Sequence, residues 1–242
     1  MPFDDPLFWC LATVGVLLTG ISKSGFAGGA GVVAVPLLAL IVSIPLAVML
    51  MLPLLLLMDV RTISYYRCHV SFLQLKIILP AGLIGVICGG LLMGYVSEHG
   101  LKMMLGGLSI LFSVWQALTP HLVRVRGAAL FWSLLSGITS TLIHAGGPPI
   151  NIYLIGKQLD MQLWLATASV YFGMLNLAKI IPYSLLGQWN SSLLFNSLVL
   201  LPVALLGVRV GHWIQGRLPE HVFAKACRVL LFVSGVLLIV RS

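Results

Sequence analysis

Charged side chains are scarce in this chain: Asp, Glu, Lys and Arg make up 8% of its 242 residues, where a soluble domain carries roughly 25%. Apolar residues make up 60% of the sequence. A water-soluble globule of this size could not cover its surface with so few charges, which excludes most soluble enzyme classes. The composition therefore predicts an integral membrane protein.

Other signals are also missing. The four cysteines lie far apart and form no CxxC spacing, so the sequence predicts neither a disulfide framework nor a metal site. No Ser, His and carboxylate stand at the spacing of a catalytic set, and no HExxH is present. Basic residues occur singly between apolar runs, so the net charge of +8 does not indicate nucleic acid. The sequence thus predicts no enzyme, no cofactor and no nucleic-acid partner.

The apolar residues fall into runs separated by polar residues, glycine or proline. These runs cover about residues 7–21, 26–44, 46–66, 73–96, 102–118, 128–143, 147–157, 163–186, 192–215 and 222–241. Two neighbouring pairs, 7–21 with 26–44 and 128–143 with 147–157, have short arms broken by a glycine-rich stretch. Because about 20 apolar residues are needed to cross the hydrocarbon core, each pair is predicted to be a broken helix or a re-entrant hairpin.

The two breaks belong to an internal repeat. The first runs GISKSGFAGGAGVVAVP from Gly20, and the second runs GITSTLIHAGGPPINIYL from Gly137. Further pairs at the same offset of 117, or at 122 after a small insertion, are Asp59/Asn176, Tyr66/Tyr183, Pro80/Pro202, Gly85/Gly207 and Gly89/Gly211. The chain is therefore predicted to form one membrane domain of two transmembrane repeats, residues 1–120 and 121–242.

Each predicted repeat has one broken hairpin followed by three full helices, so an odd number of crossings turns the second repeat upside down. Basic residues test this orientation, since Lys and Arg are enriched in cytoplasmic loops. With both termini outside, only Lys102 and Arg241 lie on the outer side. The cytoplasmic side then holds Arg67, Lys76, Arg124, Arg126, Lys157, Arg209, Arg217, Lys225 and Arg228. The predicted fold class is an all-α polytopic membrane protein of two inverted repeats.

Each break offers groups that bind anions. A glycine-rich break between two half-helices exposes backbone N–H groups and a positive helix end within the membrane. If the hairpins enter from opposite faces, their tips meet near the bilayer midplane and form a substrate site. The predicted binding residues are Ser22, Lys23, Ser24, Gly25, Gly28 and Gly29 in the first break and Thr139, Ser140, Thr141, His144, Gly146, Gly147 and Asn151 in the second.

Lys23 is the most informative of these residues, because a lysine deep in a membrane is seldom kept without a partner or a ligand. Two interpretations stay open: contact with a substrate, or snorkelling toward water and structural pairing with Asp59. Asp59, Asn176 and Lys179 lie near the middle of their predicted helices. Asp59 and Lys179 form a structural ion pair, a proton site, or both. His144 is a hydrogen-bond donor to an anion, a proton carrier or a packing residue.

The two glycine-rich stretches resemble those of the sulfite exporter TauE/SafE family of membrane permeases, also called the TSUP family. The family's G-x-x-K/S-G-F-x-G-G-G/A-G-x-x-x-x-P stretch corresponds to Gly20–Pro36, and its G-G-P-P stretch to Gly146–Pro149. The resemblance covers nearly the whole chain and implies a carrier of the bacterial inner membrane for sulfite or a small organosulfonate. The motif positions are Ser22, Lys23, Gly25, Gly28, Gly29, Gly31, Gly146, Gly147 and Pro148, whereas His144 and Asp59 are added on physical reasoning alone.

The sequence thus predicts a secondary transporter that exports a small sulfur-containing oxyanion, either sulfite or a small organosulfonate, across the bacterial inner membrane. Two alternatives from other classes stay open: an anion channel, and a non-transporting subunit of a membrane complex. The predicted partners are the small anion and the lipid bilayer. The sequence leaves open the coupling ion and whether the protein forms a homo-oligomer.

Overall fold

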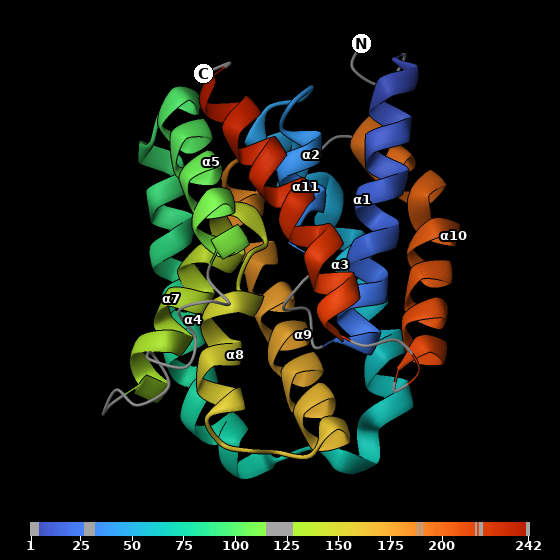
Figure 1. Cartoon of the computed structure of the whole chain (residues 1–242). Helices are drawn as coiled ribbons and strands as arrows, with labels where there is room; N and C mark the ends of the chain where they lie inside the picture. The colour runs from blue at the N-terminus through green and yellow to red at the C-terminus, as the bar shows by residue number, and fades with distance from the viewer. Residues whose placement is uncertain are drawn as a thin grey trace.

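The computed structural model of the protein describes residues 5–26, 32–114, 128–187, 189, 191–215, 217 and 220–240. All regular elements in these ranges are helical (Figure 1). In chain order they are α1 (Pro6–Gly25), α2 (Ala34–Leu38), α3 (Ile44–Tyr66), η2 (Arg67–His69), α4 (Phe72–Tyr95), α5 (Glu98–Val114), α7 (Ala128–Ile143), α8 (Gly147–Ile155), α9 (Met161–Leu185), α10 (Ser191–Ile214) and α11 (Glu220–Val240).

Polar residues between the apolar runs begin several of these helices. The Asp5 carboxylate accepts a hydrogen bond from the Leu7 N–H at 2.8 Å, and Pro6 stands in the first turn of α1, where its missing N–H leaves no bond unmade. The Asp160 carboxylate caps α9 in the same way, by accepting from the Leu163 N–H at 2.9 Å. The polar residues between the apolar runs therefore set helix boundaries by capping the first turn.

Five described helices are long and apolar enough to cross a membrane: α1, α3, α4, α9 and α10. Of these, α3 and α9 are the most buried, and they contact each other along the centre of the bundle. In contrast, α4 and α10 expose apolar side chains, among them Ile84, Ile87, Leu91, Leu198 and Leu206. Such faces suit contact with lipid. The prediction of an all-helical protein is confirmed for the described residues, which contain five candidate membrane spans.

The first hairpin differs from its predicted form. Its first arm was expected over about 7–21, too short to cross the membrane, yet α1 continues to Gly25 and is a candidate span. Ser24 stays within the helix because its Oγ donates to carbonyl oxygens of α1 and α10 at 3.2 and 2.7 Å. In the second arm, expected over about 26–44, the described residues that precede α3 form one helix, the five-residue α2.

The second hairpin has the short arms that the sequence predicts, since α7 has 16 residues and α8 has 9. In Figure 1, α2 lies toward the end of the bundle where α1 begins and α11 ends, whereas α8 lies toward the opposite end. The short arms of the two hairpins therefore occupy opposite ends of the bundle.

Close backbone packing joins the long arm of each hairpin to a full-length helix, α1 to α10 and α7 to α4. Gly20 lies against Gly207 in the first contact, and Gly137 lies against Gly85 in the second. A Cβ atom on Gly137 would lie 2.1 Å from the carbonyl oxygen of Gly82. Because only glycine permits so close an approach, these positions fix how the long arms sit on their neighbours.

Two tyrosines hold the ends of these long arms. Tyr66 at the end of α3 donates to the carbonyl oxygen of Ser24 at 2.8 Å. Tyr183 near the end of α9 donates to the carbonyl oxygen of Thr141 at 2.5 Å. Both tyrosines are buried. The two central helices thus each anchor one of the hairpin arms close to its break.

Candidate functional site

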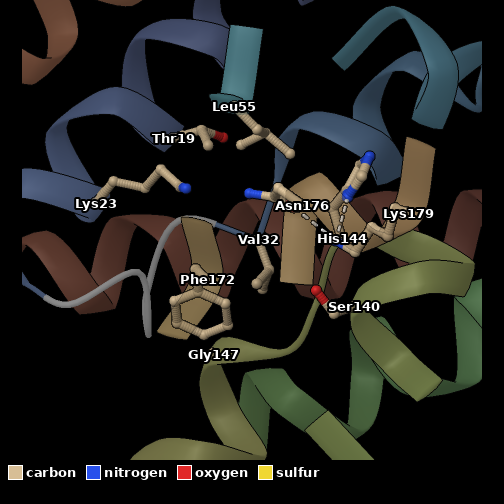
Figure 2. A pocket seen from close by; sticks show the side chains of 10 residues that line it. All are labelled: Thr19, Lys23, Val32, Leu55, Ser140, His144, Gly147, Phe172, Asn176 and Lys179. Carbon is tan, nitrogen blue, oxygen red and sulfur yellow. Dashed lines mark hydrogen bonds between the residues drawn. The ribbon is translucent and has the colours of Figure 1, made fainter. Parts of the chain in front are cut away.

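The two hairpin breaks line one cavity in the helix bundle (Figure 2). Its volume is about 40 Å³, which is room for roughly three water molecules at about 10–15 Å³ each. The lining side chains come from both hairpins and from the central helices α3 and α9. They are Thr19, Lys23, Val32, Leu55, Ser140, His144, Gly147, Phe172, Asn176 and Lys179.

The second break is built around His144, the residue that follows the end of α7. Its φ of 54° lies in the left-handed region, which costs a non-glycine residue about 1–2 kcal/mol. The His144 N–H donates to the Ser140 carbonyl oxygen at 3.0 Å, and the N–H of Ala145 donates to the α7 backbone at 3.2 Å. The left-handed conformation of His144 turns the chain and directs the imidazole toward the cavity. Strained backbone of this kind is common at functional sites.

The N-terminus of α8 offers fewer backbone donors than its glycine-rich sequence indicates. Pro148 and Pro149 have no N–H group. Gly147 is therefore the only one of the first three α8 residues that carries an N–H, and it lines the cavity. Side chains consequently supply most of the polar groups on this side of the site.

Lys23 and Asp59 form an ion pair between α1 and α3. Both are largely withdrawn from solvent, with side chains 10% and 4% exposed. The Lys23 ammonium group also lies 5.9 Å from the centre of the Phe172 ring, a contact that favours a cation. Structural pairing of Lys23 with Asp59, one of the two interpretations of Lys23, is thus present, and Lys23 at the same time lines the cavity (Figure 2).

A chain of hydrogen bonds continues from this ion pair along α9 to the second break. Asn176 Nδ2 donates to Asp59 Oδ2 at 2.6 Å, and Lys179 Nζ donates to Asn176 Oδ1 at 2.8 Å. Lys179 Nζ also lies 3.1 Å from His144 Nδ1, as the dashed lines in Figure 2 mark. Asp59 therefore pairs with Lys23 and not with Lys179, because Asn176 lies between the two.

The hydrogen bonds of His144 define its proton positions. Its Nε2 lies 2.8 Å from the carbonyl oxygen of Val48, which can only accept, so Nε2 carries a hydrogen. Its Nδ1 then accepts from the Lys179 ammonium group. In this arrangement the imidazole is neutral, and the positive charge of the protonated pair lies on Lys179.

The described residues around the cavity carry more positive than negative charge. When Lys179 is protonated, the network contains two cations, Lys23 and Lys179, and one carboxylate, Asp59. Lys179 is 1% exposed, and within the part of the chain that the structure describes its Nζ forms no ion pair with a carboxylate. An unbalanced charge in such surroundings is unfavourable. The cavity is therefore suited to take up an anion.

Several predicted binding residues instead stabilise the helices around the cavity. The hydroxyl groups of Ser24, Thr139 and Thr141 donate to backbone carbonyl oxygens, at distances of 2.7 to 3.4 Å. A Cβ atom on Gly25 would come within 2.9 Å of α10, and one on Gly146 within 2.8 Å of α7. These positions therefore allow close helix packing, and none of the five lines the cavity.

The other predicted residues have separate surroundings. Ser140 and Gly147 line the cavity. Asn151 accepts a hydrogen bond from the Trp164 indole at 3.2 Å. Ser22 is fully buried, and its Oγ has no hydrogen-bond partner among the described residues. The predictions for Gly28 and Gly29 lie outside the described residues.

Four lining residues were not predicted from the sequence: Thr19, Val32, Leu55 and Phe172. Three of them precede a predicted residue by four positions, since Thr19 precedes Lys23, Leu55 precedes Asp59 and Phe172 precedes Asn176. Residues four apart share a helix face. This four-residue spacing could therefore have predicted that these three residues line the cavity.

Together, these features define a multi-pass helical membrane protein with a buried, positively charged cavity between two hairpin breaks. The described residues contain no group of three His, Cys, Asp or Glu that could hold a metal. The model of the sulfite exporter TauE/SafE family matches residues 12–238, nearly the whole chain, and the chain belongs to this family. Comparisons with curated proteins and with solved structures give no match. The family resemblance inferred from the two glycine-rich stretches is confirmed, and membership in a transporter family is consistent with a protein that is not an enzyme.

Proposed function

We propose that this protein is a secondary transporter that exports a small sulfur-containing oxyanion, such as sulfite, across the bacterial inner membrane. The observation that carries the proposal is the cavity itself: residues of both hairpin breaks surround it, and its network has one cation in excess when Lys179 is protonated. Family membership supports a sulfur anion as the substrate class. Lys23 and Lys179 supply the counter-charge, and Ser140 supplies a hydroxyl donor.

The cavity dimensions support a small substrate. A volume of about 40 Å³ suits an ion of a few heavy atoms better than a long organosulfonate. Leu55 and Phe172 form apolar walls beside the two lysines. Apolar walls limit competing water and strengthen the attraction between the ammonium groups and an anion.

We also propose that residues 1–120 and 121–242 are inverted repeats. The packing supports this, because α1 on α10 corresponds to α7 on α4, while α3 on α9 and α5 on α11 join equivalent helices. Asp59 and Asn176, which are 117 positions apart, are hydrogen-bonded to each other. A pseudo-two-fold axis would pass near this bond, beside the cavity, where inverted-repeat transporters place the substrate.

The proposed orientation puts both termini outside. In support, α1 begins and α11 ends at one end of the bundle, and α3 meets α4 at the other end (Figure 1). The junction of α3 with α4 carries Arg67, and the junction of α8 with α9 carries Lys157, as cytoplasmic loops commonly do. A membrane potential that is negative inside then favours the export of net negative charge, by about 2.3 kcal/mol per charge moved per 100 mV.

Counterflow in proteoliposomes tests this function. Vesicles loaded with unlabelled sulfite, thiosulfate or methanesulfonate are expected to take up the labelled anion faster than vesicles without an internal anion, because a carrier exchanges substrate. Lys102→Ala is the matched control, since Lys102 pairs with Glu98 on α5 at 3.3 Å and does not line the cavity. Unitary currents without counterflow would support a channel instead. Absence of both counterflow and binding for every anion would support a non-transporting subunit and contradict the proposal.

A further inference from the structure

The pair formed by Lys179 and His144 has a feature that anion binding alone does not require. Both side chains line the cavity, and their nitrogens lie 3.1 Å apart with one hydrogen between them. Lys179 is 1% exposed, and its other partner is the amide oxygen of Asn176 at 2.8 Å. This cation lies beside a base and has no carboxylate partner among the described residues. Ionisable groups placed in this way within membranes commonly take part in proton transfer.

We propose that the Lys179–His144 pair carries one proton, which crosses the membrane together with each anion. This inference rests on the proposed transport function and names its coupling ion. The reaction is a cotransport in which one anion and one proton leave the same side and arrive at the same side, and no bond other than N–H is broken or formed.

The hydrogen bonds allow two states of the pair that differ by one positive charge. In the protonated state, the Lys179 ammonium group donates to Asn176 Oδ1 and to His144 Nδ1. After loss of one proton, the neutral amine still has hydrogens to donate to the same acceptors. His144 is neutral in both states, because its Nδ1 accepts a hydrogen bond from Lys179 while its Nε2 hydrogen is donated to the Val48 carbonyl oxygen at 2.8 Å. The proton can therefore leave without orphaning a buried partner.

The surrounding charges couple this proton to the anion. The titratable groups that face the pair are Lys23 from α1, Asp59 from α3 and the Tyr183 ring, whose centre lies 6.1 Å from that of His144. Lys23 and Asp59 balance each other. The Lys179 charge is then balanced only while an anion occupies the cavity. The loaded carrier therefore keeps the proton and the empty carrier releases it. An anion without the proton, or the proton without an anion, would leave a buried charge without a partner.

Coupling one proton to each anion fixes the net charge moved. A monoanion such as methanesulfonate crosses without net charge. A dianion such as thiosulfate crosses with one negative charge, so a potential that is negative inside still drives its export, as the proposed direction requires. Both anions are fully ionised near neutral pH and bring no proton of their own, which makes them suitable probes.

Equilibrium distribution of the probe anions in proteoliposomes, with the potential set by potassium and valinomycin, tests the proposal. For wild type, the ratio of internal to external thiosulfate is expected to change tenfold per about 59 mV of membrane potential. A dianion that crosses without a proton would instead give a tenfold change per about 30 mV. The methanesulfonate ratio is expected to ignore the potential. Both ratios are expected to change about tenfold per unit of pH difference, with accumulation on the side away from the acid. A thiosulfate ratio of tenfold per about 30 mV that ignores pH would overturn the proton proposal.

Variants sharpen the assignment to this pair. Any anion movement left in Lys179→Gln is expected to show the slope of the unaccompanied anion. The guanidinium group introduced by Lys179→Arg does not release its proton, so this variant is expected to retain anion exchange better than net anion efflux. Lys102→Gln should keep the wild-type slopes. If wild type shows counterflow but its anion distribution has the slopes of an unaccompanied anion, the proton proposal is wrong and the transport function stands. If wild type shows no counterflow for any of the anions, the transport function itself is wrong.

Discussion

Replacing Lys23 with alanine is expected to reduce anion flux by roughly 100-fold or more, because a charge-assisted contact contributes about 3 kcal/mol and each 1.4 kcal/mol is about tenfold. The single variant also leaves Asp59 buried at 3% exposure without its cation. Removing one partner of a buried pair destabilises a protein by about 3–5 kcal/mol. Flux is therefore measured by counterflow, on protein that elutes as a single folded species in detergent.

The double variant Lys23→Ala/Asp59→Asn separates binding from folding. It removes both charges, and the new amide oxygen still accepts from Asn176 Nδ2, so the helix contact is kept. The double variant is expected to fold well and to transport no better than the single variant. Wild-type flux in either variant would exclude Lys23 from the substrate site.

Replacing Gly137 with alanine is expected to destabilise the protein by several kcal/mol. The new Cβ atom would lie 2.1 Å from the carbonyl oxygen of Gly82 and 2.9 Å from the Cα of Gly85. Neither backbone atom moves without separating α4 from α7, and overpacking of this kind commonly costs about 1–3 kcal/mol or more. The midpoint of thermal unfolding in detergent, read from size-exclusion elution, measures the loss.

Gly107→Ala is the matched control for this packing prediction. Gly107 lies within α5, and a Cβ atom there would have nothing within 4 Å. Alanine is preferred over glycine within a helix by about 1 kcal/mol, so this variant is expected to unfold at the same temperature or slightly higher. Equal unfolding temperatures for the two variants would contradict the packing of α4 against α7.

The helices follow closely from the sequence because membrane helices are set by local properties. The run of about 163–186 became α9, and the run of about 192–215 became α10. Apolar length and capping residues specify such helices without knowledge of their neighbours. The first hairpin was harder to predict. Whether Ser24 ends a helix or stays within it depends on a carbonyl oxygen of α10, which is 184 positions away.

The candidate site could be predicted only in part for a similar reason. Lys23, Asp59, Asn176 and Lys179 stand out because charged or amide groups in apolar helices need partners. Thr139 and Thr141 looked equally suitable as donors, yet their hydroxyl groups bond to backbone carbonyl oxygens of their own region. Ser and Thr in helices commonly do this. Sequence polarity alone does not distinguish a free hydroxyl group from one that is already used.

The most direct test of the account is to locate a bound oxyanion. Selenite is a heavier analogue of sulfite, and its selenium gives an anomalous signal in crystals of the protein grown with the ion. We expect the peak within the cavity, in contact with Lys23 and Lys179 and near the hydroxyl group of Ser140. A peak only at the exposed Arg209 of α10 or at Arg217, or no peak in the cavity of a protein that transports selenite, would contradict the central claim.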